Sequence, residues 1–240
     1  MVVKSQIKLI KSLQQKKYRS KNRMFVVEGI KMVQELLNSN FTVFKIFTTD
    51  LSNFKTRADI VEVVSNSELR QMSGLKNPNQ ALGAFYIPES KTVDFDDWIL
   101  VLDDVRDPGN LGTIIRLCDW FGIKNLVCSK NTVDCYNPKV LQASMGSIAR
   151  VNVVYNDLEH FLDNTGKPLY GAFMSGSSVY KEQLPKGGIL VMGNEANGIS
   201  KNVEKLISSK IAIPQFGDST TESLNVATAT AILLNEIRRK

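Results

Sequence analysis

The chain has little histidine and little cysteine. Its 240 residues hold one histidine, His160, so a histidine-based catalytic triad has a single candidate and a zinc site would need scattered ligands. The polar surroundings of His160, "YNDLEHFLDN", predict a surface residue. Cys118, Cys128 and Cys135 match no paired metal-ligand spacing, and we expect small buried thiols in a reducing compartment. The sequence therefore predicts neither a metal site nor a disulfide framework.

Long apolar runs are also missing. No run approaches the ~20 residues that a bilayer crossing needs. The first residues lack the continuous apolar segment of a secretory signal. With 43% hydrophobic and 22% charged residues, the composition is that of an ordinary globular protein. We therefore expect a cytoplasmic protein that does not bind membranes.

Acidic residues are absent from positions 1–23, which carry more basic groups than the whole chain's net charge of +6. Such a dense positive segment fits a polyanionic partner. A solvated helix face or a frayed tail is an equal alternative, and an organelle presequence is a third, although lysine outnumbers arginine here. The basic residues are Lys4, Lys8, Lys11, Lys16, Lys17, Arg19, Lys21 and Arg23.

Apolar patterning predicts a small α/β domain over residues 1–90. A helix is expected at 30–39, and Ser65 and Glu68 have the spacing of a capping box at the start of another. The polar stretch that follows has no periodicity, so we place a linker at 91–97. The strand-like runs are "MFVVEG", "FTVFKIFTT", "IVEVVS" and "QALGAFYIP".

Residues 98–240 predict a second, larger α/β domain. Its apolar runs are continuous, which indicates strands buried on both faces in a mostly parallel sheet with helices on both faces. In such sheets, ligands bind at the carboxyl ends of the strands. The runs are "WILVLDDV", "NLVCS", "PLYGAFM", "GILVMG" and "KIAIP".

The first candidate loop, "RDPGN", follows one of these strands and precedes the helix "LGTIIRLCDWFG". Asn110 is expected at the N-cap, and Arg116 lies on the side of the helix away from its apolar residues. Taken alone, Asn110 is adequately explained as a cap and Arg116 as a surface cation. The residues expected to cover the core side are Ile114, Ile115, Leu117, Cys118 and Phe121.

The second loop, "GILVMGNEANGIS", resembles two phosphate-binding motifs and fits neither. Ile199 stands where a P-loop needs lysine, and Glu195 puts a negative charge where phosphates would lie. The loop is better suited to a cationic or neutral ligand. The alternative is a plain turn with Glu195 exposed.

The third loop runs from Pro214 to Ser223 and precedes a helix rich in small residues and basic at its end. By itself this segment indicates core packing and a capped helix, with Ser223 as one candidate for the cap.

Together the loops resemble a known family. "LDDVRDPGNLGTIIRLCDWFG", "ILVMGNEANGIS" and "IPQFGDSTTESLNVATATAILLNEIRR" are similar, in order and spacing, to the three signature motifs of the SpoU (TrmH) family. These proteins are RNA 2′-O-ribose methyltransferases of the SPOUT superfamily. "KNRMFVVEGIKMVQELL" also resembles that family's N-terminal substrate-binding domain.

The resemblance implies an S-adenosylmethionine-dependent enzyme that methylates a ribose 2′-hydroxyl in structured rRNA or tRNA. It implies a deep trefoil knot in residues 98–240, against the usual rule, an RNA-binding domain over residues 1–90, and a homodimer without metal. Matching the motifs predicts that the cofactor contacts Gly193, Ile213, Leu224, Met192 and Met174. Basic residues expected at the RNA are Lys8, Lys16, Lys17, Arg19 and Arg23.

The family's polar set corresponds to Asn110, Arg116, Glu195, Ser223 and Asn225. The reaction is an in-line attack of the 2′-hydroxyl on the methyl carbon of a sulfonium, which requires positioning and proton removal. The family resemblance offers Arg116 as the base. Because a guanidinium has a pKa above ~12, clamping the RNA phosphate and orienting the hydroxyl is an equally physical role.

Two departures from the family pattern concern the cofactor loops. Ala196 replaces a usual glycine, and residues 214–223 form a slightly longer loop than expected. Two rival functions stay open: a non-catalytic RNA-binding or assembly factor on this scaffold, and a nucleotide-binding enzyme using the loop from Gly193 to Gly198. The missing lysine disfavours the second rival.

Overall fold

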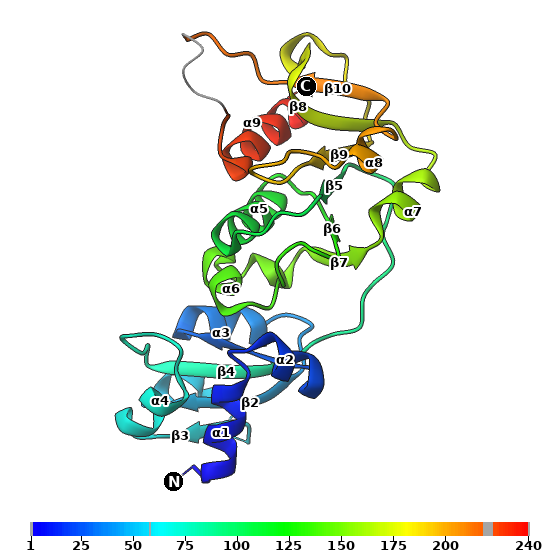
Figure 1. The fold of residues 1–240 in the computed structure, drawn as a ribbon. Coiled ribbons are helices and arrows are strands. Elements are labelled where there is room, and N and C mark those ends of the chain that lie inside the picture. Colours follow the sequence, from blue (N-terminus) through cyan, green and yellow to red (C-terminus); the bar gives the residue numbers. More distant parts are fainter. Residues whose placement is uncertain (1, 58, 218–222, 240) are drawn as a thin grey trace. The chain divides into compact units, whose positions relative to one another are not determined.

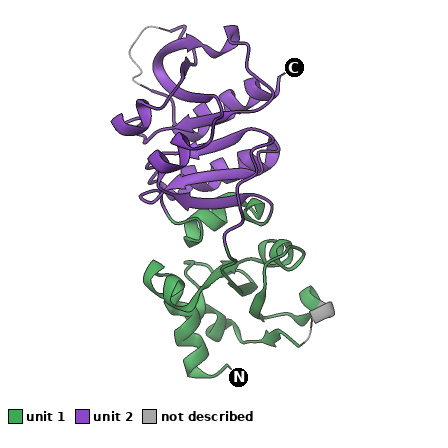
Figure 2. Ribbon diagram, turned by 90° about the vertical axis from the view of Figure 1, so that its right-hand side faces the viewer, with its two compact units in different colours: residues 1–89, 134–149 green, residues 90–133, 150–240 purple. Residues whose placement is uncertain are grey.

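A computed structural model describes residues 2–57, 59–217 and 223–239 (Figure 1). The chain packs as two compact units (Figure 2): residues 1–89 with 134–149, and residues 90–133 with 150–240. The division into a domain at 1–90, a linker at 91–97 and a domain at 98–240 stays a prediction. The sequence does not indicate that residues 134–149 group with the first unit.

The first unit is built on a four-stranded mixed sheet in the order β1-β4-β2-β3. Strand β4 is antiparallel to both β1 and β2, while β2 and β3 are parallel. Its strands are β1 (Met24–Glu28), β2 (Val43–Thr48), β3 (Val61–Val63) and β4 (Ala81–Tyr86). Its helices are α1 (Lys4–Ser12), α2 (Lys16–Asn22), α3 (Ile30–Leu37), α4 (Asn66–Met72) and α6 (Pro138–Ser144), with 3-10 turns η1 (Leu51–Arg57) and η2 (Ser147–Ala149).

Apolar side chains of α1, α4 and the sheet form the core of this unit, and Ile10, Leu13 and Met72 are fully buried in it. The predicted capping box is confirmed, because Ser65 Oγ accepts the main-chain N–H of Glu68 and the Glu68 carboxylate accepts the main-chain N–H of Ser65.

The segment 134–149 is held to this unit by a buried ion pair. Arg19 of α2 donates to the Asp134 carboxylate from Nε at 3.0 Å and from Nη2 at 2.6 Å. The Tyr136 ring packs on Phe25 of β1, with centroids 4.6 Å apart. A buried guanidinium needs such partners, so Asp134 and Arg19 stabilise each other's burial.

The second unit is a six-stranded sheet in the order β10-β8-β9-β5-β6-β7, and every described strand pair in it is parallel. The predicted parallel α/β fold is thereby confirmed. Its strands are β5 (Ile99–Leu102), β6 (Asn125–Ser129), β7 (Asn152–Asn156), β8 (Leu169–Ser178), β9 (Ile189–Met192) and β10 (Ser209–Ala212). Its helices are α5 (Pro108–Trp120), α7 (Leu158–Asp163), α8 (Lys201–Glu204) and α9 (Val226–Arg238), with a 3-10 turn η3 (Val179–Lys181).

Burial explains which strands the sequence predicts. The central strands β5 and β9 are buried at every residue, so they appear as continuous apolar runs. Strand β7 lies at the edge of the sheet and buries only Val154 fully, so the sequence patterns do not reveal it. Helices flank the sheet, with α5 packed on α9 and α7 on α8 (Figure 1). The trefoil knot stays a prediction.

None of the described helices combines the length and the apolar character that a membrane crossing requires.

Candidate functional site

Three loops leave the carboxyl ends of strands in the second unit. Loop 1 (103–107) joins β5 to α5, loop 2 (193–200) joins β9 to α8, and loop 3 (213–225) joins β10 to α9. Residues 218–222 of loop 3, with much of the length difference predicted there, lie outside the described residues. Because β5 and β9 are parallel neighbours, loops 1 and 2 leave the same edge of the sheet side by side.

Helix α5 begins one turn earlier than expected. Asp107, not Asn110, is its N-cap, and the Asp107 carboxylate accepts the main-chain N–H of Asn110 at 2.8 Å. Pro108 occupies the first helical position, where its fixed φ and missing N–H suit a helix start. The prediction that Asn110 is the cap was wrong, and the sequence signal that shows the correct cap is Asp-Pro-Gly. The Asn110 side chain is consequently free to bond outside its helix.

Polar side chains from the first turn of α5, from loop 2 and from loop 3 meet in one hydrogen-bonded series. Asn110 donates from Nδ2 to Oε1 of Glu195 at 2.9 Å. Asn225 donates from Nδ2 to Oδ1 of Asn110, also at 2.9 Å. These partners are 85 and 115 residues apart in the chain, so the tertiary fold alone brings them together. We call Asn225, Asn110 and Glu195 the amide relay.

The direction of the amide relay follows from the start of α9. Asn225 is the N-cap of that helix, and its Oδ1 accepts the N–H groups of Ala227 at 2.9 Å and Thr228 at 3.3 Å. Only the amide oxygen can accept, so the Asn225 NH₂ group must face Asn110. The Asn110 oxygen is then occupied, and its NH₂ group faces Glu195. The helix start thus aims a donor at the Glu195 carboxylate.

Ser223 is exposed two residues before this cap, so its predicted role as a possible cap of the last helix was wrong.

Arg116 lies on the exposed side of α5, as its position in the sequence predicts. Its side chain makes no hydrogen bond or ion pair with another described residue. Thr113 and Trp120 share this face, and Trp120 is 82% exposed. The guanidinium is therefore available to a ligand that approaches from solvent.

Loop 2 is a tight turn that needs glycine at two positions. A Cβ on Gly193 would lie 2.2 Å from the carbonyl carbon of Gly198, and Gly198 itself has φ of +68°. Ala196 is not among the described residues with positive φ, so the turn does not need glycine at that position.

The predicted cofactor positions differ in exposure. Met192 is almost fully buried at the end of β9, and Ile213 is half-buried, whereas Leu224 and Met174 are 46% and 63% exposed. Loop 2 and the described parts of loop 3 contain no lysine or arginine to neutralise phosphates. Main-chain groups, exposed apolar side chains and the Glu195 carboxylate fit the predicted S-adenosylmethionine, which is cationic at sulfur and carries no phosphate.

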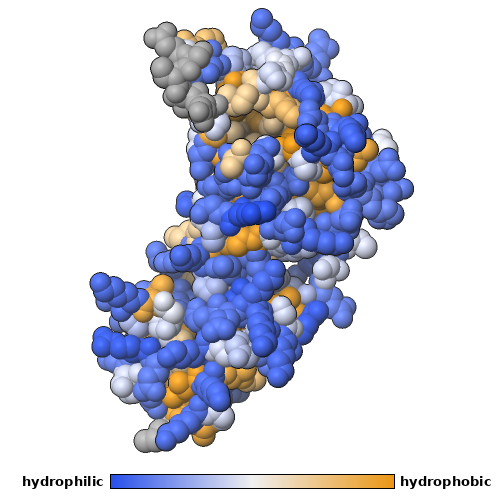
Figure 3. Space-filling view, in the orientation of Figure 1, coloured by the Kyte–Doolittle hydropathy of each residue, from blue (hydrophilic) through white to orange (hydrophobic). Residues whose placement is uncertain are grey.

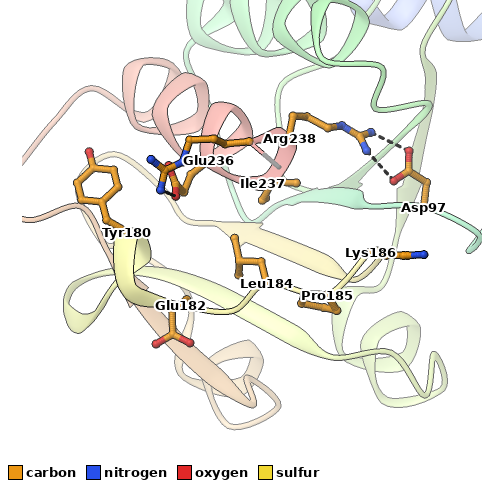
Figure 4. Close-up of a pocket in the computed structure, with 10 residues that line it drawn as sticks. Asp97, Tyr180, Glu182, Leu184, Pro185, Lys186, Glu236, Ile237 and Arg238 are labelled. Carbon is orange, nitrogen blue, oxygen red and sulfur yellow. Dashed lines mark hydrogen bonds and ion pairs between the residues drawn. The ribbon is translucent and has the colours of Figure 1, made fainter.

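A cavity of about 690 Å³ is lined by residues that precede β5 and β9, by the segment that follows β8 and by the end of α9 (Figure 4). Four of the charged side chains that line it are already paired with each other. Arg238 binds Asp97 through two hydrogen bonds of 2.9 and 2.7 Å, and Arg239 pairs with Glu236 at 2.6 Å. The amide relay is thus the better candidate site.

The other residues singled out from the sequence lie away from the relay. The three cysteines are buried thiols, and His160 is exposed, as predicted. Among the described residues, no group of three or more histidine, cysteine, aspartate or glutamate side chains is arranged to hold a metal ion.

Four of the five predicted RNA-binding residues are exposed on the first unit, namely Lys8, Lys16, Lys17 and Arg23. Hydrophilic side chains predominate on the face drawn in Figure 3. Arg19 is only 3% exposed, and it donates to Asp134 and to the main-chain oxygens of Leu13 and Gln14. Because its guanidinium binds groups of the protein itself, we exclude Arg19 from the proposed RNA contacts.

Comparison with known proteins finds a matching family model for each unit. Residues 97–235 match the model of the SpoU rRNA Methylase family, and residues 4–83 match that of the MRM3-like substrate binding domain. The chain is 30% identical over 236 residues to the 23S rRNA (guanosine(2553)-2′-O)-methyltransferase RlmP of Bacillus subtilis (strain 168). That alignment covers 95% of this chain and 94% of the relative.

Two solved structures share nearly the whole fold. One is that of a TrmH-family protein from Porphyromonas gingivalis, with 37% identity, a TM-score of 0.92 and coverage of 99% of this chain and 98% of that chain. The other is the AdoMet-bound rRNA methyltransferase from Sinorhizobium meliloti, with 28% identity, a TM-score of 0.87 and coverage of 99% and 95%. Since the family model matches residues 97–235, which include all three residues of the amide relay, this chain belongs to the SpoU rRNA methylase family.

Proposed function

We propose that this chain transfers the methyl group of S-adenosylmethionine to a ribose 2′-hydroxyl of RNA, with ribosomal RNA as the substrate class. The observation that carries the proposal is the amide relay, which unites the three family motifs at one edge of the sheet. The names of the relatives support it, since the Bacillus subtilis protein acts on 23S rRNA and the Sinorhizobium meliloti structure holds AdoMet, which is S-adenosylmethionine.

We assign cofactor binding to loops 2 and 3. S-adenosylmethionine, when bound, supplies an electrophilic methyl group on a sulfonium. The main chain at Gly193 and Ile213 and the exposed side chains of Leu224 and Met174 would hold its uncharged parts. Met192, at the end of β9, would close the inner side of this pocket.

We assign binding of the RNA nucleotide that accepts the methyl group to Glu195 and Arg116. One Glu195 oxygen is occupied by Asn110, while no hydrogen bond from a described residue reaches the other, which can accept one from the ribose hydroxyl. Arg116 is exposed and would clamp the neighbouring phosphate. A guanidinium remains protonated at neutral pH, so we favour the clamp over the base for Arg116. Ser223 is exposed beside Leu224 and stays a candidate for the same hydroxyl.

We assign RNA binding to the first unit, through Lys8, Lys16, Lys17 and Arg23. Reversing the charge of Lys16 and Lys17 to glutamate is expected to weaken RNA binding. The slope of affinity against salt should fall by about one for each phosphate that the variant no longer binds. The matched control is Lys167→Glu with Lys186→Glu, two exposed lysines of the second unit. Equal effects of the two pairs would show that only net charge matters.

The decisive experiment maps ribose methylation in total RNA from a strain that lacks the protein. We expect loss of a specific 2′-O-methyl group, restored by the wild-type copy and by Arg150→Ala, but not by Arg116→Ala. Arg150 is a matched control because its ion pair with Asp119 lies at the surface. If no methyl group is lost and calorimetry detects no S-adenosylmethionine binding, the chain is a non-catalytic RNA-binding protein and the proposal is wrong.

A homodimer, which the family resemblance implies, is part of the proposal, and sedimentation equilibrium of the purified chain tests it.

A further inference from the structure

Asn194 is the residue before Glu195, and it is not one of the polar positions predicted from the three motifs. Its Oδ1 accepts the main-chain N–H groups of Ala196 at 2.9 Å and Asn197 at 3.0 Å. Its main chain exchanges two hydrogen bonds of 2.9 Å with Gly198. The oxygen of this side chain therefore closes the turn that carries Glu195.

The other end of the Asn194 amide leaves loop 2. Nδ2 donates to the main-chain oxygen of Asp104 in loop 1 at 2.7 Å. Asp104 has φ of +62°. This backbone conformation is unfavourable for any residue other than glycine, so it needs support from its surroundings. That support is present, because Ser129 Oγ accepts the Asp104 N–H at 2.9 Å and Arg106 holds the Asp104 carboxylate through two bonds of 2.8 and 2.9 Å.

A second bond joins the same two loops at the far end of loop 2. The N–H of Ser200 donates to Oδ2 of Asp103 at 2.8 Å, and Asp103 is buried. Loop 2 is thus tied to loop 1 at its beginning and at its end. Between these ties Glu195 is exposed, and its side chain is held by the hydrogen bond from Asn110, so packing does not set its position.

We propose that Asn194 is a positioning residue for methyl transfer: its Nδ2 bond to Asp104 sets loop 2 against loop 1 and thereby places the Glu195 carboxylate at Asn110. This inference rests on the proposed function, since its effect is read through methyl transfer. Asn194 acts through Glu195 and touches neither substrate nor cofactor in this assignment. A displacement of the order of 1 Å at a reacting group can cost about 100-fold in rate.

Asn194→Asp tests the tie to loop 1 separately from the turn. The substitution keeps the shape and the oxygen that accepts from Ala196 and Asn197, but it removes the donor and sets a carboxylate against the Asp104 carbonyl. With ribosomal RNA from a strain lacking the protein and tritiated S-adenosylmethionine, we expect kcat to fall by about 10- to 100-fold. The KM for RNA and the calorimetric affinity for S-adenosylmethionine should stay near wild type.

The matched control is Asn202→Asp in α8, which removes an exposed amide donor to Glu159 and should leave kcat unchanged. A double-mutant cycle with Glu195→Gln separates positioning from general structure. If Asn194 acts through Glu195, the two losses are strongly non-additive.

Additive losses, a wild-type kcat for Asn194→Asp, or a loss of cofactor affinity equal to the loss of rate would each overturn the inference while the proposed function stands. Absence of transfer by the wild-type protein would instead refute the proposed function.

Discussion

Replacing Asn110 by aspartate changes its contact with Glu195 from a hydrogen bond into a repulsion between two carboxylates. In the native site Asn110 Nδ2 donates to the Glu195 carboxylate at 2.9 Å. The variant keeps the oxygen that accepts from Asn225, but it has no donor and presents a second negative charge to Glu195. We expect methyl transfer to fall more in Asn110→Asp than in Asn110→Ala, which removes the donor without adding a charge.

The size of the effect follows from two contributions. A hydrogen bond to a charged group contributes about 1.5–3 kcal/mol. Two unit charges about 4 Å apart repel by roughly 1 kcal/mol in water and roughly 4 kcal/mol at a partly buried protein surface. Asn110 is half-buried and Glu195 exposed, so the lower part of that range applies. A total of about 2.5–4 kcal/mol corresponds to a loss of about 70- to 1,000-fold in kcat/KM.

The pH profile identifies the cause. Two adjacent carboxylates raise the pKa of one of them, because the second negative charge is unfavourable. Protonation of the introduced carboxyl group restores a donor, so the deficit of Asn110→Asp relative to wild type should shrink as the pH falls toward ~5. Methyl transfer to ribosomal RNA is measured for wild type, Asn110→Asp and Asn110→Ala across this range. Equal losses in both variants at every pH would show that Asn110 and Glu195 do not meet in the working enzyme.

Three further predictions concern other parts of the structure. Arg116→Ala should abolish methyl transfer with near-normal affinity for S-adenosylmethionine, and Arg116→Lys should recover little, because a point charge lacks the guanidinium fork; activity in Arg116→Ala would contradict the clamp. Arg19→Ala should lower the free energy of unfolding, measured in urea, by about 3 kcal/mol, because it leaves the half-buried carboxylate of Asp134 without its ion-pair partner, whereas a purely RNA-binding Arg19 would leave unfolding unchanged. Arg238 lowers the pKa of Asp97 below its ordinary value near 3.8. Stability from that pair is therefore present above pH ~4 and lost as the pH falls through the lowered pKa, and Arg238→Ala should remove this acid-dependent part of the unfolding curve.

The sequence predicted those helices and strands whose formation depends on neighbouring residues. The continuous apolar runs of β5 and β9 indicated strands buried on both faces, and the spacing of Ser65 and Glu68 indicated a capping box. Strand β7 was not predicted because it lies at the edge of the sheet, buries only Val154 fully and shows no continuous apolar run. The start of α5 was misplaced because Asn110 is a good cap by residue type, whereas the helix begins at the Asp-Pro-Gly turn.

The high density of basic residues likewise indicated the role of a segment, but not the role of each residue in it. The basic residues of positions 1–23 were treated alike, yet Arg19 is buried against Asp134 while Lys16 and Lys17 are exposed. The partner of Arg19 is 115 residues away, in a segment that packs with the first unit only after folding. No local pattern contains that information.

The order of residues by itself determined the class of fold, the three motif loops and the polar residues within them, because burial periodicity and turn chemistry are written in neighbouring positions. Tertiary structure alone decided that Asn225 caps α9 while its amide group donates to Asn110, and that Asn110 in turn donates to Glu195. The physical reason is that an amide has one acceptor end and one donor end. Its direction is decided only when distant partners occupy both.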